Sequence, residues 1–174
     1  PDVSHKTEVG GVKTNIKEDM ALETAFFEIM GEVKTRVEGA RIDGMMLQKM
    51  IFGGIELIAG GKCDRDFGPV IMFGMGGTLA EILKDVSFRL APICREEAYE
   101  MIEETSAFSL LKGVRGEKPY DIALLADILE RLSILMADFP QITELDLNPL
   151  RMHHDGTAAS VLDARILLEN KHII

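Results

Sequence analysis

The chain has 174 residues and a formal net charge of −10, with 47% hydrophobic and 28% charged residues. This length suits one or two small globular domains, and the acidic balance argues against nucleic-acid binding, because phosphate backbones attract basic surfaces. The residues contain no apolar run of membrane-spanning length, no basic-then-apolar leader and no CxxC pair. We therefore expect a cytoplasmic protein without membrane or nucleic-acid partners.

The first third of the chain predicts strands on either side of a helix. Residues 10–16 (GGVKTNI) are strand-like, and Asp19 can cap an amphipathic helix that extends to Val37. Residues 42–51 (IDGMMLQKMI) and 54–61 (GIELIAGG) predict two apolar strands with a glycine turn or bulge between them. The pattern is that of a mixed α and β protein.

The middle of the chain continues this alternation of helices and strands. Residues 69–77 (PVIMFGMGG) predict a buried strand that ends in glycines. The other expected elements are a short helix at 78–83, a strand at 86–92, a helix at 95–108, a loop at 113–119 and a long helix at 121–139.

The most informative stretch is residues 142–168, where two alternating runs flank an Asp-Gly dipeptide, a strong signal for a two-residue hairpin. Pairing outward from that turn places Asn148 opposite Asp163 and Asp146 opposite Arg165. Cross-strand partners have Cβ atoms about 4.5–5.5 Å apart. Period-two alternation then puts these four side chains on one face of the hairpin.

The resulting cluster holds two carboxylates, an amide and a guanidinium. Carboxylate and amide oxygens suit a hard cation such as Mg²⁺, which shares its other positions with water and nucleotide phosphates. The alternative is a solvated polar face with a surface salt bridge, and spacing alone leaves both open. Pro149, which removes a ladder donor, is a point where the register could slip. The opposite face is predicted to enter the core through Leu145, Leu147, Leu162 and Ala164.

Two weaker signals lie earlier in the chain. Gly74, Gly76 and Gly77 stand between a strand and a helix start, where backbone N–H groups could hold an anion, although a plain tight turn is the simpler interpretation. Glu56 lies in an otherwise apolar strand, so its carboxylate needs a partner. That partner could be a ribose hydroxyl or a structural arginine.

Five blocks of the sequence, taken together, resemble the ATP-grasp part of NDP-forming acyl-CoA synthetases, whose best-known members are the ADP-forming acetyl-CoA synthetases. The blocks are SHKTEVGGV, GIELIAGG, DFGPVIMFGMGGTLAEILKDVSFRLAP, GVRGEKP and ELDLNPL…VLDARI. The resemblance runs from Pro1 to about Leu168, and succinyl-CoA synthetase is a more distant relative. It implies an ATP-grasp fold of α+β type, with part of the first lobe at 1–50 and the whole second lobe at 51–174.

The resemblance also implies the residues that carry the chemistry. His5 occupies the position of a phosphohistidine that ferries a phosphoryl group, and the glycines at 10–11 would supply a flexible attachment. Asp146 matches an acidic residue that orients this histidine, and Asn148 and Asp163 match metal ligands. ATP or ADP and Mg²⁺ are the implied cofactors.

Further matched positions would bind the nucleotide. Gln48, Lys49 and Met50 lie at the hinge that brackets adenine, and Glu56 matches a residue that contacts the ribose. The residues expected near the phosphates are Gly76, Gly77, Arg165 and, with a weaker match, Arg89.

Two departures from the family pattern stand out. Cys63 occupies the place of the usual arginine, and Arg65 stands two positions further on. The family's phosphate-contacting lysine belongs to a strand that precedes this sequence, so part of the first lobe is expected to lie outside it.

Two functions follow as hypotheses. The first is the nucleotide-binding part of an ADP-forming acyl-CoA synthetase, working with a CoA-binding subunit or domain in a hetero-oligomer or a dimer of a fused chain. The second is a non-catalytic ATP-grasp module that regulates a larger acetyltransferase-type fusion protein. The presence of His5, Asp146, Asn148 and Asp163 together favours the first, because a module that only binds does not need a carrier histidine.

Overall fold

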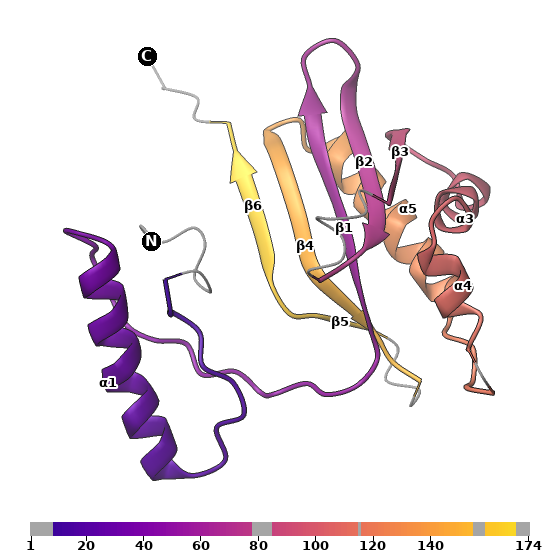
Figure 1. Cartoon of the computed structure of the whole chain (residues 1–174). Helices are drawn as coiled ribbons and strands as arrows, with labels where there is room; N and C mark the ends of the chain where they lie inside the picture. Colours follow the sequence, from indigo (N-terminus) through magenta and orange to yellow (C-terminus); the bar gives the residue numbers. More distant parts are fainter. Residues whose placement is uncertain (1–8, 78–84, 115, 155–158, 170–174) are drawn as a thin grey trace, which may run out of the picture. The chain divides into compact units, whose positions relative to one another are not determined.

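The computed structural model describes residues 9–77, 85–114, 116–154 and 159–169. These residues belong to two compact units, Pro1–Phe52 and Gly53–Ile174, which we call unit 1 and unit 2 (Figure 1). In those described ranges, no helix combines the length and the hydrophobicity that a bilayer crossing requires.

The described part of unit 1 contains the helix α1 (Asp19–Arg36), which confirms the first predicted helix. Its N-cap is Glu18, and Asp19 is the first helical residue, so the prediction that Asp19 caps this helix is wrong. Instead, the negative charge of Asp19 lies in the first turn, where it complements the positive end of the helix dipole. Ala25 and Val33 are the buried residues of α1.

The two strands predicted for unit 1 at 10–16 and 42–51 are not formed. Apolar and β-branched residues favour extended backbone, but a strand also needs a neighbour that completes its hydrogen-bond ladder. All the paired strands of the described sheet come from unit 2, so neither segment has such a neighbour.

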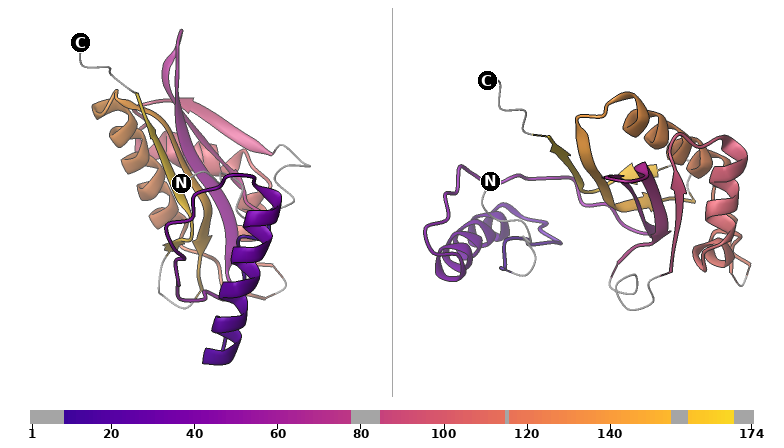
Figure 2. Two further views of the ribbon diagram at one scale, coloured as in Figure 1. Left: turned by 90° about the vertical axis from the view of Figure 1, so that its left-hand side faces the viewer. Right: turned by 90° about the horizontal axis from the view of Figure 1, so that it is seen from above.

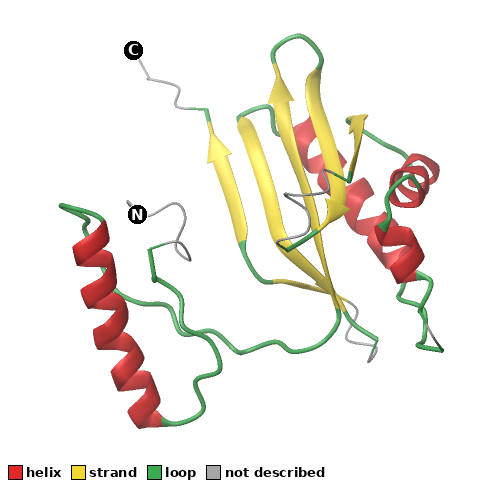
Figure 3. Cartoon of the chain, in the orientation of Figure 1, coloured by secondary structure: helices red, strands yellow, loops and turns green. Residues whose placement is uncertain are grey.

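Unit 2 is built on a six-stranded antiparallel sheet in the order β3-β2-β1-β4-β5, with β6 also paired to β4. The strands are β1 (Ile55–Asp64), β2 (Gly68–Met75), β3 (Val86–Leu90), β4 (Ile142–Met152), β5 (Ala159–Val161) and β6 (Ala164–Leu168). The helices are α3 (Arg95–Glu103), α4 (Ala107–Leu111) and α5 (Ile122–Asp138). These helices lie on one side of the sheet, as Figures 2 and 3 show.

Most predicted elements of unit 2 are confirmed, because the strands β1, β2 and β3 and the helix α5 fall where the sequence places them. The short helix expected at 78–83 lies outside the described residues. The single helix expected at 95–108 is instead two helices, α3 and α4. Thr105 Oγ1 donates to the Ile102 carbonyl, and the Ser106 N–H donates to the Asp85 carboxylate. Such hydrogen bonds to and from side chains compete with those of a continuous helix, so the helix is interrupted here.

The core lies between α5 and the sheet face that it covers. Leu57 and Phe73 from the strands and Leu125 and Leu129 from the helix are fully buried there. The Asp121 carboxylate begins α5 by accepting a hydrogen bond from the Leu124 N–H at 2.9 Å. We call this side of the sheet the core face.

Arg89 of β3 lies on the core face, because it pairs with the buried Ile71 of β2. Its guanidinium donates to both carboxylate oxygens of Glu104, and Ser87 Oγ donates to Glu104 Oε2 at 2.6 Å. Hydrogen bonds from Arg89, and then from Ser87, lower the pKa of Glu104 to about 2. This role in tying β3 to the end of α3 removes Arg89 from the candidate phosphate contacts.

Replacing Glu104 with glutamine should therefore destabilise unit 2 at neutral pH. A carboxyl whose pKa is lower in the folded chain stabilises the fold above its unfolded value of about 4.5, and this contribution disappears as the pH falls towards 2. Urea denaturation of the chain should show a lower midpoint for Glu104→Gln at pH 7 and converging midpoints near pH 2. Glu103→Gln, on the adjacent exposed glutamate, is the control; a difference independent of pH would contradict this assignment.

The hairpin register predicted for the end of the chain is confirmed. Asp146 pairs with Arg165 between β4 and β6, and the Asn148 N–H donates to the Asp163 carbonyl at 3.1 Å. Of the predicted core positions, Leu145 is buried and Leu147 packs against the core, whereas the prediction for Ala164 is wrong because Ala164 is exposed. It lies on β6 at the sheet edge, whereas α5 packs over β1 and β2.

Candidate functional site

Three predicted site residues of unit 2, Glu56, Asp146 and Arg165, lie on the sheet face opposite the core face. Leu145 is buried in the core, so its neighbour Asp146 points to the other side. Asp146 lies opposite Gly60 of β1, and Glu56 lies four residues before Gly60 on the same strand face. We call the face that carries Glu56, Asp146 and Arg165 the site face.

A β-bulge interrupts the pairing of β1 with β4 in the middle of the site. Leu57 pairs with Leu150 and Ala59 with Leu147, so Ile58 alone lies opposite the Asn148–Pro149 dipeptide. The extra residue reverses the alternation along β4, as bulges do near functional sites. The pairing of β4 with β5 and β6 keeps one register before and after the bulge, so Asn148 remains opposite Asp163.

This bulge brings to the site face a residue that the sequence analysis missed. Strict alternation from Asp146 would point Arg151 into the core, but the extra residue places it directly opposite Glu56 instead. Arg151 Nη2 donates to Glu56 Oε1 in an ion pair. Of the two partners expected for Glu56, the structure therefore contains the arginine. Pro149, where the register was open to slippage, was the only signal in the sequence for this change.

Gly76 and Gly77 follow β2 and pack against Glu56. The Gly76 N–H donates to the Glu56 carbonyl at 2.9 Å, and a Cβ on Gly76 would lie 2.9 Å from backbone atoms of Glu56 and Leu57. Gly77 has φ +74°, and a Cβ there would lie 3.3 Å from Glu56 Oε2. Glycine is required at both positions, which lets the chain after β2 approach the Glu56 carboxylate closely.

The carboxylate of Asp146 is half-buried among charged neighbours. Burial raises the pKa of Asp146, the nearby Glu144 and Asp163 carboxylates raise it further, and Arg165 acts in the opposite direction. Arg165 Nη1 lies 3.7 Å from Glu144 Oε1, and Lys62 is the cross-strand neighbour of Glu144. The site face therefore carries a row of alternating charges next to Asp146.

Asn148 and Asp163 are both exposed and lie opposite each other. Among the described side chains, no group of three or more His, Cys, Asp and Glu residues could hold a metal ion by itself. One amide and one carboxylate oxygen nevertheless fit Mg²⁺, which usually takes one or two protein oxygens and completes its octahedron with water and phosphate. The residues present thus suit a metal that arrives with a nucleotide better than a closed structural metal site.

Three of the candidate site residues of unit 1 lie in the described part of the chain. Gln48, Lys49 and Met50 are exposed and belong to no helix or strand. His5 lies outside the described residues. Gly10 has φ +72°, and a Cβ there would lie 3.2 Å from Glu32 Cβ of α1, so glycine is needed at this position for a tight turn.

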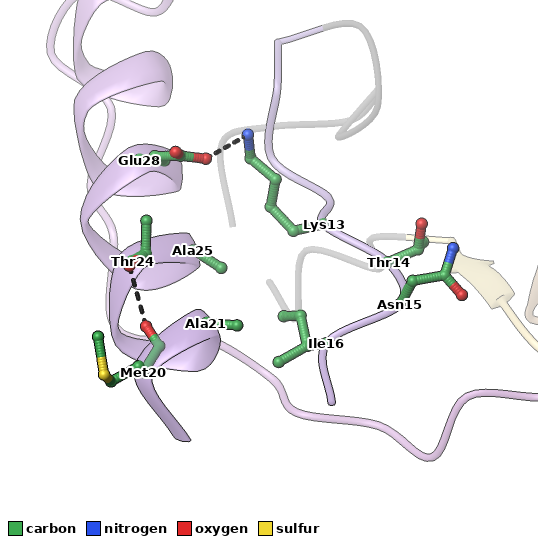
Figure 4. Close-up of a pocket in the computed structure, with 9 residues that line it drawn as sticks. All are labelled: Lys13, Thr14, Asn15, Ile16, Met20, Ala21, Thr24, Ala25 and Glu28. Carbon is green, nitrogen blue, oxygen red and sulfur yellow. Dashed lines mark hydrogen bonds and ion pairs between the residues drawn. The ribbon is translucent and has the colours of Figure 1, made fainter. Parts of the chain in front are cut away.

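A shallow hollow of about 400 Å³ lies between residues 13–16 and α1 (Figure 4). The ion pair between Lys13 Nζ and Glu28 Oε2, at 2.6 Å, crosses it. None of the predicted site residues lines this hollow, so we do not assign it to the nucleotide.

The exposed hairpin between β1 and β2 holds the departure from the family pattern. Cys63 is exposed at the end of β1, and Asp64 Oδ1 accepts hydrogen bonds from the Asp66 and Phe67 N–H groups. Arg65 belongs to this turn, nine residues beyond Glu56 and at the opposite end of β1. Arg65 therefore lies at the other end of β1 from Gly76 and Gly77, since Gly76 hydrogen-bonds to Glu56 near the start of that strand.

The fold and the site face define the class of protein. Residues 1–168 match the family model of the ATP-grasp domain, and the chain belongs to this family. The particular relatives are acyl-CoA synthetases. The chain is 55% identical over 168 residues to acetate–CoA ligase (ADP-forming) I of Archaeoglobus fulgidus, covering 97% of this chain and 24% of the relative. It is 45% identical to the beta subunit of acetate–CoA ligase (ADP-forming) I of Pyrococcus furiosus, covering 97% and 72%.

Solved structures agree with this assignment. The dinucleotide-forming acetyl-coenzyme A synthetase 1 of Candidatus Korarchaeum cryptofilum, in complex with coenzyme A and Ca-AMPCP, matches with a TM-score of 0.90 and 41% identity over 97% of this chain and 72% of that chain. A second structure of the same synthetase, with Mg-AMPPCP and a phosphohistidine segment pointing towards the nucleotide-binding site, matches with a TM-score of 0.81 and 38% identity, over 97% and 73%. The chain thus spans about a quarter of the Archaeoglobus relative and nearly three quarters of the others.

Proposed function

We propose that this chain is the nucleotide-binding part of an ADP-forming acyl-CoA synthetase, in which it transfers a phosphoryl group between a phosphohistidine and ADP. The overall reaction is acyl-CoA + ADP + phosphate ⇌ carboxylic acid + CoA + ATP. The names of the Archaeoglobus and Pyrococcus relatives, and the phosphohistidine segment in the Korarchaeum structure, support this proposal.

The order of groups along the site face carries the proposal. Glu56 comes first, the Asn148–Asp163 pair follows beside Ile58, and Asp146 lies beside Gly60. Glu56 and Gly60 are four residues apart, which is about 13 Å of strand. A nucleotide laid along β1 meets in turn a carboxylate for its ribose, oxygen ligands for a phosphate-bound metal, and a carboxylate for the incoming histidine.

Each group has one task in this arrangement. Glu56 accepts hydrogen bonds from the ribose, and Asn148 and Asp163 hold Mg²⁺, which when bound neutralises phosphate charge. Asp146 accepts a hydrogen bond from the imidazole of His5, orienting it and stabilising its charged form. In the direction of ATP synthesis, an oxygen of the ADP β-phosphate forms a bond to phosphorus. The P–N bond breaks, and its electron pair returns to the imidazole nitrogen.

The implied partner is a CoA-binding subunit or domain, which would supply the acyl chemistry. Relatives exist both as a separate beta subunit and as a chain about four times as long as this one. Either a hetero-oligomer with that subunit or a dimer of a fused chain fits the proposal. We also propose that the protein is cytoplasmic.

The test is an assay of the full-length protein, together with its CoA-binding subunit if that is a separate chain. Acetyl-CoA, other acyl-CoA thioesters, ADP and phosphate should yield ATP in a Mg²⁺-dependent reaction. Omission of phosphate or of the thioester is the control. Mg-ADP binding without ATP formation from any thioester would instead support the non-catalytic regulatory module.

A further inference from the structure

We propose that Arg151 is a positioning residue that holds the Glu56 carboxylate in the orientation in which it accepts hydrogen bonds from the sugar hydroxyls of a bound nucleotide. The inference rests on the proposed function, because it takes Glu56 as the residue that contacts the ribose. Arg151 itself belongs to none of the motifs recognised in the sequence.

The two side chains differ in a way that separates their tasks. The Arg151 side chain is 15% exposed and the Glu56 side chain 36% exposed, although they are directly opposite each other in the β1–β4 pairing. The arginine side chain is thus largely enclosed by the fold, while the glutamate side chain is more exposed on the site face. An enclosed guanidinium that donates to one carboxylate oxygen limits the rotation of the glutamate side chain.

The second carboxylate oxygen is the one offered to a ligand. Arg151 Nη2 donates to Oε1, whereas Oε2 lies on the side of Gly77, 3.3 Å from the position of a Cβ there. The backbone of Glu56 is held separately, by the hydrogen bond from the Gly76 N–H. An ionised carboxylate has about four acceptor positions, so one bond to Arg151 leaves capacity for sugar hydroxyls.

The local fold is arranged to admit this arginine. The bulge beside Ile58 points Arg151 to the site face, and its stem packs against Gly54, where a Cβ would lie 3.2 Å from Arg151 Cγ. Gly54 has φ +80°, and a Cβ there would clash with the Met152 carbonyl oxygen, so glycine is required beside the stem. On the other side, Arg151 neighbours Ser160 of β5, whose Oγ lies 3.1 Å from His153 Nε2.

A fixed carboxylate should distinguish nucleotides by their sugar hydroxyls. In the full-length protein, calorimetric titration should show Mg-ADP binding at least about tenfold more tightly than Mg-2′-deoxy-ADP or Mg-3′-deoxy-ADP, because a site built to bond a hydroxyl rejects the analogue that lacks it. Arg151→Met keeps the length of the stem and removes the donor. It should reduce this ratio to about threefold or less, with kcat at saturating ADP nearly unchanged.

Three further variants sharpen the test. Arg151→Lys keeps a positive charge but loses the planar guanidinium, so it should give a ratio of ADP to deoxy-ADP affinity between those of wild type and Arg151→Met. This variant also provides a test if Arg151→Met does not fold. In a Glu56→Gln background, Arg151→Met should not reduce the ratio of ADP to deoxy-ADP affinity any further, because Arg151 affects sugar recognition through Glu56. Arg89→Met breaks a similar arginine–glutamate pair on the core face and should leave the ratio unchanged.

The outcomes separate this inference from the function on which it rests. Wild-type protein that binds no Mg-ADP would overturn the proposed function. Wild-type protein that binds ADP and the deoxy-nucleotides equally, or Arg151 variants that keep the full wild-type ratio, would overturn the inference and leave the proposed function standing. In that case the ion pair would serve the stability of the β1–β4 pairing alone.

Discussion

His5→Ala in the full-length protein is expected to abolish phosphoryl exchange between ATP and ADP, with a loss of at least about a thousandfold. The imidazole forms the covalent intermediate itself, and removal of a nucleophile removes the route rather than a single contact. Binding of Mg-ADP should remain nearly intact, because the side chain acts in transfer and does not hold the bound nucleotide.

The measurement is incubation with ATP labelled in the γ-phosphate, in the presence of Mg²⁺. Label on His5 should be lost in acid and kept in alkali, as expected of a phosphoramidate, whereas label on the nearby Thr7 hydroxyl would survive acid. His154→Ala, on a histidine whose ring stacks on Tyr120 with centroids 3.7 Å apart, is the matched control and should keep the label. Acid-stable label, or full activity of His5→Ala, would exclude the carrier role.

Asn148→Ala and Asp163→Ala are each expected to weaken Mg-ADP binding by more than tenfold. Each removes an oxygen ligand from a cation that demands near-ideal octahedral geometry, and tenfold corresponds to about 1.4 kcal/mol. Calorimetric titration of the full-length protein measures the effect. Affinity for ADP measured in EDTA should be the same for wild type and variants, because the lost interaction operates only through the metal.

A control carboxylate lies on α5, away from the site face. Asp127 accepts a hydrogen bond from Arg131 Nε at 2.7 Å, so Asp127→Ala removes a paired carboxylate without touching the hairpin. It should leave Mg-ADP affinity unchanged. If the two hairpin variants behave like Asp127→Ala, the pairing of Asn148 with Asp163 has no part in metal binding.

The hairpin at the end of the chain was predictable because its information is local. An Asp-Gly dipeptide between two alternating runs sets the register, and the register decides which residues are opposite each other. The pairing of Asp146 with Arg165 and of Asn148 with Asp163 therefore follows from residues close to one another in the sequence. The roles of these residues stay proposals, since a cross-strand pair does not by itself identify its ligand.

Apart from the Asp19 cap, which is displaced by one residue, the wrong predictions share one cause: a local sequence pattern does not show which distant residues will pack beside it. Segments 10–16 and 42–51 have strand-like composition but no adjacent strand in the described part of unit 1. Ala164 alternates correctly with its neighbours, yet it lies on an edge strand beyond the cover of α5. The helix predicted at 95–108 divides because Ser106 hydrogen-bonds to Asp85, 21 residues away in the sequence.

Periodicity and the hairpin turn were enough to establish the strands β1 to β3, the helix α5 and the hairpin register, because these depend on residues close in sequence. The family motifs added the ATP-grasp fold. Only the tertiary structure decided the partner of Glu56. A one-residue bulge between β1 and β4 turns Arg151 from the core face to the site face, and that bulge exists only where two strands distant in the sequence meet with unequal numbers of residues.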